Sequence, residues 1–405
     1  MVSNTMNKSS WSVYLLLCLC HTLMHVFTQM HIALIPILRT ELSLDTLTIG
    51  LIAAIPLLTQ GVFTIPGGLI ADRVNRLQLI AVGLLISGVT GILMSGANNV
   101  LQLMVFASMF HISSTLLHPP ALSVVGGLVP PNIGGKDLGR GKLLGFFGSA
   151  GTLGIALGPI TLAFLVGTVG WRAVYLMWSI PAIIIPALIL RLKLGKTHTS
   201  EENHPKKKIS TEFHVFRNIG IVLVLTQMGV RSMGGQAIST YISSYFVDRL
   251  MIEPSFAILL FGMNPLMGVF ASSIGGVMVD KFGEKIWLFL GFISQIISLS
   301  LVAFIPDITL TIIGYLSYAF FGIMEMPAEQ SLLTNLTDRG SLGFVFSLSF
   351  LPGSIVGSFG PILVALLINA SDIWYIFPYA IAMYFVCIFI IGLLWKRTNQ
   401  ISQHS

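Results

Sequence analysis

The sequence predicts an all-α membrane protein with twelve transmembrane helices in two pseudo-symmetric six-helix bundles. Only 9% of its 405 residues are charged and 54% are hydrophobic, whereas a soluble domain carries about 25% charged residues. Apolar runs long enough to cross a bilayer, about 20 residues each, recur along the chain. A short polar motif also appears twice, about half a chain length apart.

The apolar runs divide into two sets of six around one long polar segment, residues 191–218, which contains three consecutive lysines. We therefore expect bundles at 1–195 and 218–405, joined by a cytoplasmic linker at 196–217. The expected helices of the first bundle are 11–37, 48–70, 77–96, 101–128, 142–166 and 172–191, and those of the second are 219–247, 255–279, 286–305, 309–334, 342–367 and 373–395.

The basic residues are biased towards one side of the predicted membrane. With the N-terminus inside, 18 of the 22 Lys and Arg residues fall in cytoplasmic segments, and such an excess marks cytoplasmic loops. We expect a multi-pass protein of the cell (plasma or inner) membrane with both termini cytoplasmic. The net charge of +6 is then a topology signal and does not indicate nucleic acid. The first apolar run is too long for a signal-peptide core, so we expect it to remain as helix 1.

Neither a metal nor a cofactor is expected from the motifs. Cys18, Cys20 and Cys387 lie in apolar runs without zinc-type spacing, which predicts neither a disulfide nor a metal site. The fragment GRGKLL from Gly139 lacks the spacing and the hydroxyl of a phosphate-binding loop. ATP-driven transport and enzymatic activity are therefore not expected.

The duplicated motif reads GGLIADRVNR at residues 67–76 and GGVMVDKFGEK at residues 275–285. Duplication of this kind is typical of transporters. An aspartate at the end of a span can accept hydrogen bonds from a neighbouring helix N-terminus, and the basic residue after it can reach carbonyl groups. We expect polar clasps that close the inner side, so the predicted gating residues are Asp72, Arg73, Asp280 and Lys281.

Two further repeats support the duplication. HPPAL from His118 matches EMPAEQ from Glu325, and GSAGTLGIALGP, which ends at Pro159, matches GSIVGSFGP, which ends at Pro361. The small residues of the second repeat allow close helix approach, and a proline weakens a helix. Gly154, Gly158 and Pro159 are predicted to take part in gating, with plain close packing as the alternative.

Ionisable residues inside the spans are the strongest functional signals, because each charged one costs about 3 kcal/mol or more at membrane depth. The predicted spans place them in four helices. We expect substrate binding by Arg231, His21, His25, His111, Gln227 and Gln236, and proton coupling by Glu325, Glu329 and His118.

Each of these residues also has a structural interpretation. A histidine within a helix can be neutral and hydrogen bonded, and the glutamates could be solvated at the interface. Arg231 has no such interpretation at a helix centre, so we expect it to bind an anionic group or to pair with a carboxylate.

The motif with Gly68, Asp72 and Arg73, repeated at Gly276, resembles the loop signature of the major facilitator superfamily, although Asn75 replaces a usual glycine. Within that superfamily the chain resembles the fosmidomycin-resistance-like drug exporters. The matching residues are His21, IPILRTELSLDTLTIG (35–50), His118-Pro119 and SSYF (243–246). The resemblance implies that helices 1, 4, 7 and 10 line a central cavity. His25 and Pro120 stand where that branch tends to have acidic residues.

The predicted function is secondary active transport of a small anionic or amphiphilic compound by alternating access, preferably as proton-coupled efflux. The alternatives are proton-coupled uptake of an organic anion or sugar, and a membrane-embedded lipid-handling protein or enzyme, in which His21, His25 and His111 could hold a metal. The expected partners are the substrate, protons and the lipid bilayer, with no nucleic acid, and the expected state is a monomer.

Overall fold

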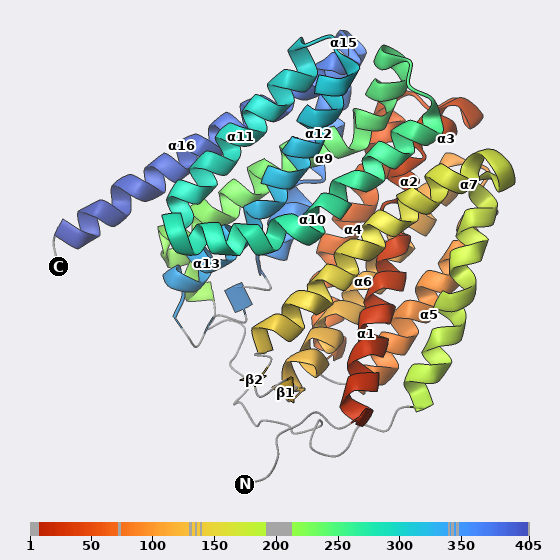
Figure 1. Ribbon diagram of the computed structural model, residues 1–405, viewed down its shortest axis with the longest axis horizontal. Helices are drawn as coiled ribbons and strands as arrows, with labels where there is room; N and C mark the ends of the chain where they lie inside the picture. Colours follow the sequence, from red (N-terminus) through yellow and green to blue (C-terminus); the bar gives the residue numbers. More distant parts are fainter. Residues whose placement is uncertain are drawn as a thin grey trace. The chain divides into compact units, whose positions relative to one another are not determined.

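The computed structural model describes residues 8–71, 74–128, 132–133, 136–137, 140–191, 213–338, 341, 344–345 and 348–403. The predicted all-α fold is confirmed, since long helices make up nearly all of the described chain (Figure 1). The one departure is a pair of two-residue strands, β1 (Asn132–Ile133) and β2 (Lys136–Asp137), which pair antiparallel.

The helices follow the predicted order. The first part of the chain forms α1 (Lys8–Val26), α2 (Met30–Ala33), α3 (Ile35–Glu41), α4 (Thr46–Ala71), α5 (Arg76–Ser95), α6 (Val100–Gly127) and α7 (Arg140–Arg191). The second part forms η2 (Phe213–Arg217), α9 (Ile219–Leu250), α10 (Pro254–Phe282), α11 (Glu284–Phe304), α12 (Ile308–Met324), α13 (Met326–Leu336), η4 (Pro352–Val356), α15 (Phe359–Ala370), η5 (Ile373–Tyr375) and α16 (Ile376–Gln403).

The helix α7 contains two membrane crossings. Gly170 has φ +78° and ψ 157°, a conformation that favours glycine, and the chain turns back at that point (Figure 1). The two arms correspond to the predicted helices 142–166 and 172–191. Conversely, α12 and α13 form a single predicted span that bends at Glu325, just before Pro327.

The number of spans agrees with the predicted twelve-helix fold. Within the described residues, ten stretches are long and apolar enough to cross a membrane. One of them, Leu143–Arg191, covers both arms of α7. The helix α9, with 32 residues, lies outside that set and completes the twelve.

The chain divides into two compact units by its internal contacts. The first unit is Met1–Leu34 with Val62–His204, and the second unit is Ile35–Gly61 with Pro205–Ser405. The first half of α4 therefore groups with the second unit. There, the Tyr241 hydroxyl donates to the Thr46 carbonyl at 2.9 Å. The predicted bundle boundaries at 1–195 and 218–405 stay a prediction.

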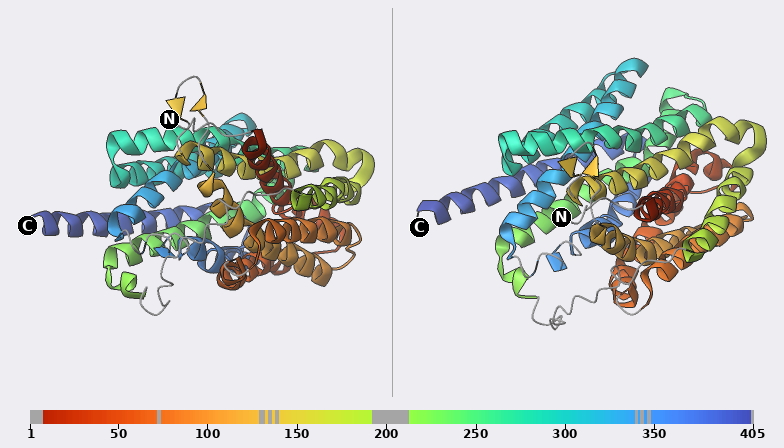
Figure 2. Two further views of the ribbon diagram at one scale, coloured as in Figure 1. Left: turned by 90° about the horizontal axis from the view of Figure 1, so that it is seen from below. Right: turned by 60° about the horizontal axis from the view of Figure 1, so that its bottom comes forward.

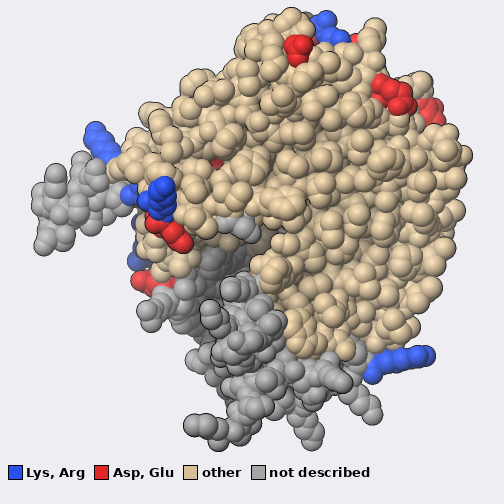
Figure 3. Space-filling model, viewed as in Figure 1, with Lys and Arg blue, Asp and Glu red and all other residues tan. Residues whose placement is uncertain are grey.

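The outer surfaces of the helices are apolar. Large side chains such as Phe164, Phe304 and Phe389 are about two-thirds exposed, at 69%, 64% and 66%. In the face shown in Figure 3, uncharged residues cover the middle and the charged residues lie towards the helix ends. This distribution suits helices that lie in a bilayer, so the chain is a multi-pass membrane protein.

Candidate functional site

Among the described residues, each unit contains a cluster of buried and half-buried polar side chains that includes residues from the predicted site. In the first unit, α1 and α6 bring together His21, His25 and His118, which we call the histidine cluster. In the second unit, α9, α11 and the bend between α12 and α13 hold Arg231, Glu325 and Glu329, with the amides Gln227 and Gln295, which we call the carboxylate cluster.

The histidine cluster forms because α1 packs closely on the first arm of α7, as the two helices run side by side (Figures 1 and 2). A Cβ on Gly151 would lie 2.5 Å from Cε1 of His21, so only glycine leaves room for the imidazole. The ring of Phe147 stacks on that of His21 with 4.1 Å between their centroids. His21 and His25 are one turn apart and therefore share a helix face.

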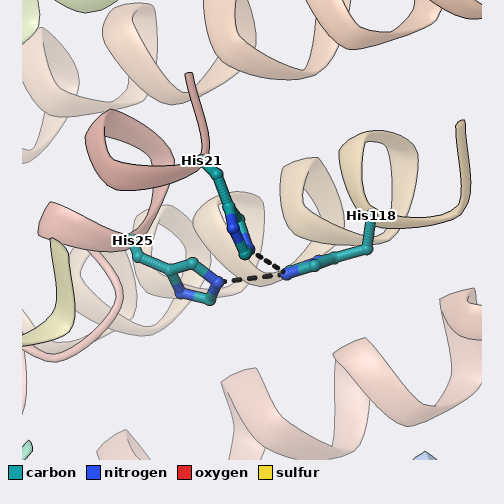
Figure 4. Close-up of side chains that lie close together, drawn as sticks. All are labelled: His21, His25 and His118. Carbon is teal, nitrogen blue, oxygen red and sulfur yellow. Dashed lines mark hydrogen bonds between the residues drawn. The ribbon is translucent and has the colours of Figure 1, made fainter. Parts of the chain in front are cut away.

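His118 completes the cluster from α6. Its Nε2 lies 3.1 Å from Nε2 of His21 and 3.0 Å from Nε2 of His25 (Figure 4). His21 is 5% exposed, and His25 and His118 are half-buried. Pro119 and Pro120 follow His118 inside α6.

His111 is not part of this cluster. The three histidines that meet are therefore His21, His25 and His118, and not His21, His25 and His111, the set expected if the protein were a metal-binding enzyme. The ring of His111 instead lies edge to face with that of His31, with 6.2 Å between centroids. Both rings are buried, at 6% and 2% exposed.

The carboxylate cluster is built around a bidentate ion pair. Arg231 donates from Nε to Oε1 of Glu329 at 2.8 Å and from Nη2 to Oε2 at 3.1 Å. Gln227 donates from Nε2 to the same Oε1 at 3.0 Å. The side chain of Glu329 is 2% exposed and that of Arg231 is 23% exposed. The side chain of Arg231 therefore stays partly exposed while its charge is balanced by Glu329.

Glu325 is the more isolated carboxylate. It is fully buried, and its Oε1 accepts a hydrogen bond from Nε2 of Gln295. Its Oε2 lies 4.0 Å from Nε of Arg231 and has no hydrogen-bond partner within the described part of the chain. Gly291 makes room for it, since a Cβ there would lie 2.6 Å from Oε1 of Glu325.

Neither Gln295 of this cluster nor Gly291, the glycine that makes room for Glu325, was among the predicted site residues. The usable signal was the amide of Gln295 in the middle of a membrane span, because polar residues at membrane depth usually have a partner. The predicted Gln236 is half-buried on α9. None of the bonds described for the Arg231–Glu329 pair involves its side chain.

The predicted gating residues stay a prediction, and two of the four polar ones lie within the described residues. Asp72 and Arg73 lie outside the described residues. Asp280 and Lys281 are exposed near the end of α10, and Nζ of Lys281 lies 5.2 Å from the centre of the Phe282 ring. A nearby carboxylate makes an inter-helix contact that was not predicted. Oε1 of Glu284 accepts from Ser331 Oγ at 2.8 Å and from Asn335 Nδ2 at 2.6 Å, which joins α11 to α13.

Gly154 and Gly158 lie at a close helix contact. A Cβ on Gly154 would lie 2.2 Å from the Thr22 carbonyl oxygen, and one on Gly158 would lie 2.1 Å from that of Val26. The second copy of this motif, GSIVGSFGP, makes the same kind of close contact. A Cβ on its Gly360 would lie 2.1 Å from the Met233 carbonyl oxygen. The geometry favours the close-packing interpretation of these glycines; Pro159 follows them inside α7.

A further ion pair in the second unit was not predicted from the sequence. Arg39 of α3 donates to Asp248 of α9 from Nη1 at 2.5 Å and from Nη2 at 2.7 Å. The next residue of α9, Arg249, forms a separate ion pair with Asp372. The sequence places Arg39 and Asp248 far apart, so no local pattern links them.

Comparison with known proteins supplies the context for these clusters. The model of the Major Facilitator Superfamily matches residues 17–361 and, in an overlapping second match, residues 224–404. The chain is 24% identical over 374 residues to the fosmidomycin resistance protein of Escherichia coli (strain K12), covering 88% of each chain. The predicted resemblance to that branch is confirmed by this match.

Other relatives transport different compounds. The chain is 25% identical over 305 residues to the multidrug transporter protein MdtP of Bacillus subtilis (strain 168), covering 74% of this chain but only 52% of that one. It is 23% identical to the benzoate transport protein of Acinetobacter baylyi over 83% of this chain and 78% of the relative. A crystal structure of a bacterial homologue of the human lysosomal transporter Spinster shares the fold, with a TM-score of 0.78, 16% identity and coverage of 96% and 98%.

Proposed function

Because the chain belongs to the Major Facilitator Superfamily, we propose that it exports a small anionic or amphiphilic compound in exchange for protons. The chain is a transporter and not an enzyme. Alternating access of a substrate site to the two sides of the membrane is the mechanism that the family implies. The substrate class, the coupling ion and the direction are the parts that we propose.

The observation that supports an anionic substrate group is the Arg231–Glu329 pair. A guanidinium is always charged and offers five donors, and Glu329 occupies two of those donors. The side chain of Arg231 remains 23% exposed. A carboxylate or phosphonate-like group can therefore bind the remaining donors or displace Glu329, which keeps the charge of Arg231 paired in both states.

The same cluster supports proton coupling through Glu325. An ionised carboxylate with an unpartnered oxygen is costly in an apolar interior, and Oε2 of Glu325 has no partner among the described residues. Arg231 already pairs with Glu329, so Glu325 is free to carry the proton while the ion pair is intact. When an anionic substrate displaces Glu329 from Arg231, a second carboxylate loses its cation beside Glu325, so the binding of substrate and the binding of a proton at this cluster are linked. We assign proton coupling to the carboxylate cluster rather than to His118.

Export is favoured by the drug-resistance relatives, and uptake of an organic anion is the second candidate. Benzoate is itself a carboxylate, so the benzoate transport relative is compatible with the same arginine. We also propose that the protein is a monomer in the cell membrane with both termini in the cytoplasm. The position of the termini is inferred because 18 of the 22 basic residues fall on the side that is then cytoplasmic.

The test is flux in proteoliposomes that contain the purified full chain. A panel of labelled aromatic and aliphatic carboxylates, a phosphonate and matched cations is offered with and without a pH gradient. Transport of the anions that depends on the gradient, and that is lost in Arg231→Gln, supports the proposal. Arg249→Gln is the matched control, because Arg249 lies on the same helix in a half-exposed pair with Asp372. Preferential transport of cations, or equal anion flux in both variants, would contradict it.

A further inference from the structure

We propose that the histidine cluster is a binding site for one divalent transition-metal ion, with Zn²⁺ as the probe ion and the Nε2 atoms of His21, His25 and His118 as ligands. Their candidate ligand atoms all lie within 4.8 Å of one another. The proposal concerns the first unit alone and does not depend on the substrate proposed for the carboxylate cluster.

The hydrogen bonds on the far side of two rings determine which nitrogen faces inward. Nδ1 of His21 lies 2.8 Å from the Phe147 carbonyl oxygen, and Nδ1 of His118 lies 2.8 Å from that of Ser114. A carbonyl only accepts, so both Nδ1 atoms carry a hydrogen. In a neutral imidazole the other nitrogen then has a lone pair. This outer arrangement, Nδ1–H to a carbonyl with Nε2 directed inward, is the one that usually orients metal-bound histidines.

The two lone pairs face each other. Nε2 of His21 and Nε2 of His118 are 3.1 Å apart, and in neutral rings no hydrogen lies between them. A cation between the two atoms would turn this repulsive contact into an attractive one. The close approach is built into the fold, because Gly151 and the stacked ring of Phe147 hold His21 in place.

His25 supplies the third nitrogen. Its Nε2 lies 3.0 Å from that of His118, and its Nδ1 is buried without a hydrogen-bond partner in the described ranges. A hydrogen on Nε2 of His25 would satisfy one lone pair of His118 and leave that of His21 unmatched. One ion bound to all three Nε2 atoms satisfies the three inward lone pairs, which a single shared hydrogen does not.

The distances suit a zinc-like ion. With Zn–N bonds of about 2.0–2.1 Å and tetrahedral angles, ligand nitrogens lie roughly 3.3 Å apart. The two short separations, 3.0 and 3.1 Å, differ from this by a few tenths of an ångström. The candidate ligand atoms of His21 and His25 lie within 4.8 Å of each other, so this pair has to approach more closely when the ion binds. Imidazole ligands suit Zn²⁺, Cu²⁺ and Ni²⁺ better than Mg²⁺ or Ca²⁺.

The exposure of the cluster and the charge of the ion determine which fourth ligand the metal would take. His25 and His118 are half-buried, so an ion can reach the cluster. Three neutral imidazoles leave the charge of a dication uncompensated in an apolar region, which is costly. We therefore expect the fourth ligand to be anionic, either hydroxide from a bound water or a small carboxylate.

The test is metal binding by the purified full chain, prepared without a histidine tag and stripped with a chelator. Isothermal titration with Zn²⁺ should give about one ion per chain, and Co²⁺ should give visible absorption bands typical of nitrogen ligands. Because loss of an outer hydrogen bond alone costs 10–100-fold in affinity, His21→Gln, His25→Gln and His118→Gln should each weaken Zn²⁺ binding by at least about ten-fold.

His31→Gln and His111→Gln are the matched controls, since both residues are buried histidines of the same unit outside the cluster. They should leave the affinity for Zn²⁺ unchanged. Zn²⁺ should also raise the unfolding temperature of the wild type and the controls but not of His25→Gln, the variant that removes the fewest contacts. The absence of stoichiometric binding, or equal losses in control and cluster variants, would overturn the proposal.

Discussion

The guanidinium of Arg231 and the carboxylate of Glu329 form a two-bond pair, with Nε to Oε1 at 2.8 Å and Nη2 to Oε2 at 3.1 Å. The pair connects α9 to α13, the helix that follows the bend at Glu325. A parallel two-bond geometry of this kind is specific for a planar group, so a substrate carboxylate is the natural competitor of Glu329.

Removing Arg231 should both abolish transport and destabilise the chain. Arg231→Ala leaves the buried Glu325 and Glu329 without a cation, and breaking a buried pair costs on the order of 3 kcal/mol. Arg231→Lys keeps the charge but not the planar fork, so we expect weaker substrate binding with residual transport. Thermal unfolding in detergent and flux in proteoliposomes measure the two effects. Arg249→Ala, whose pair with Asp372 is half-exposed, should cost no more than about 1 kcal/mol.

Glu325→Gln should uncouple transport from the pH gradient. The amide cannot take part in proton exchange but fits the same space beside Gly291, and Gln295 can still donate to its oxygen. We expect exchange of labelled for unlabelled substrate to persist while gradient-driven accumulation disappears. Glu253→Gln is the control, because Glu253 is an exposed residue at the start of α10. Undiminished accumulation in Glu325→Gln would place the proton carrier elsewhere.

The twelve spans could be predicted because each one is a long apolar run. A carboxylate partner for Arg231 was also expected from the cost of an unpaired charge at depth. The choice of Glu329 over Glu325 could not be predicted, since it depends on the bend between α12 and α13. The sequence likewise did not separate His118 from His111, because residues seven apart lie on one face of a helix. Their contacts with α1 decide which of them meets His21.

Gly158→Ala should destabilise the first unit more than a glycine substitution elsewhere on the same helix. The new methyl would lie 2.1 Å from the Val26 carbonyl oxygen, which is backbone and cannot rotate away. Overpacking of this kind costs about 1–3 kcal/mol. Gly148→Ala is the control, because no atom outside its own stretch of helix lies within 4 Å of its Cβ position; it should be neutral or stabilising by up to about 1 kcal/mol. Equal unfolding temperatures would contradict the close-packing interpretation.

Cysteine labelling should place Met251, after α9, and Lys281, near the end of α10, on opposite sides of the membrane. In a background without Cys18, Cys20 and Cys387, Met251→Cys should react with an impermeant maleimide in intact cells, because Met251 is 85% exposed in a predicted outer loop. Lys281→Cys should react only after permeabilisation. The reverse pattern would contradict the orientation derived from the basic residues.

Asp280→Asn should lower turnover without lowering the amount of protein in the membrane, if the duplicated motif closes the inner side. Asp280 is exposed, so its loss leaves no buried group unpaired. Glu284→Gln provides the comparison, because Glu284 already accepts hydrogen bonds from Ser331 and Asn335 within the second unit. A structural bond of this kind contributes about 1 kcal/mol, so we expect Glu284→Gln to reduce stability slightly at normal turnover. Wild-type flux in Asp280→Asn, at equal protein levels, would remove Asp280 from the gating residues and leave the motif as a topology signal.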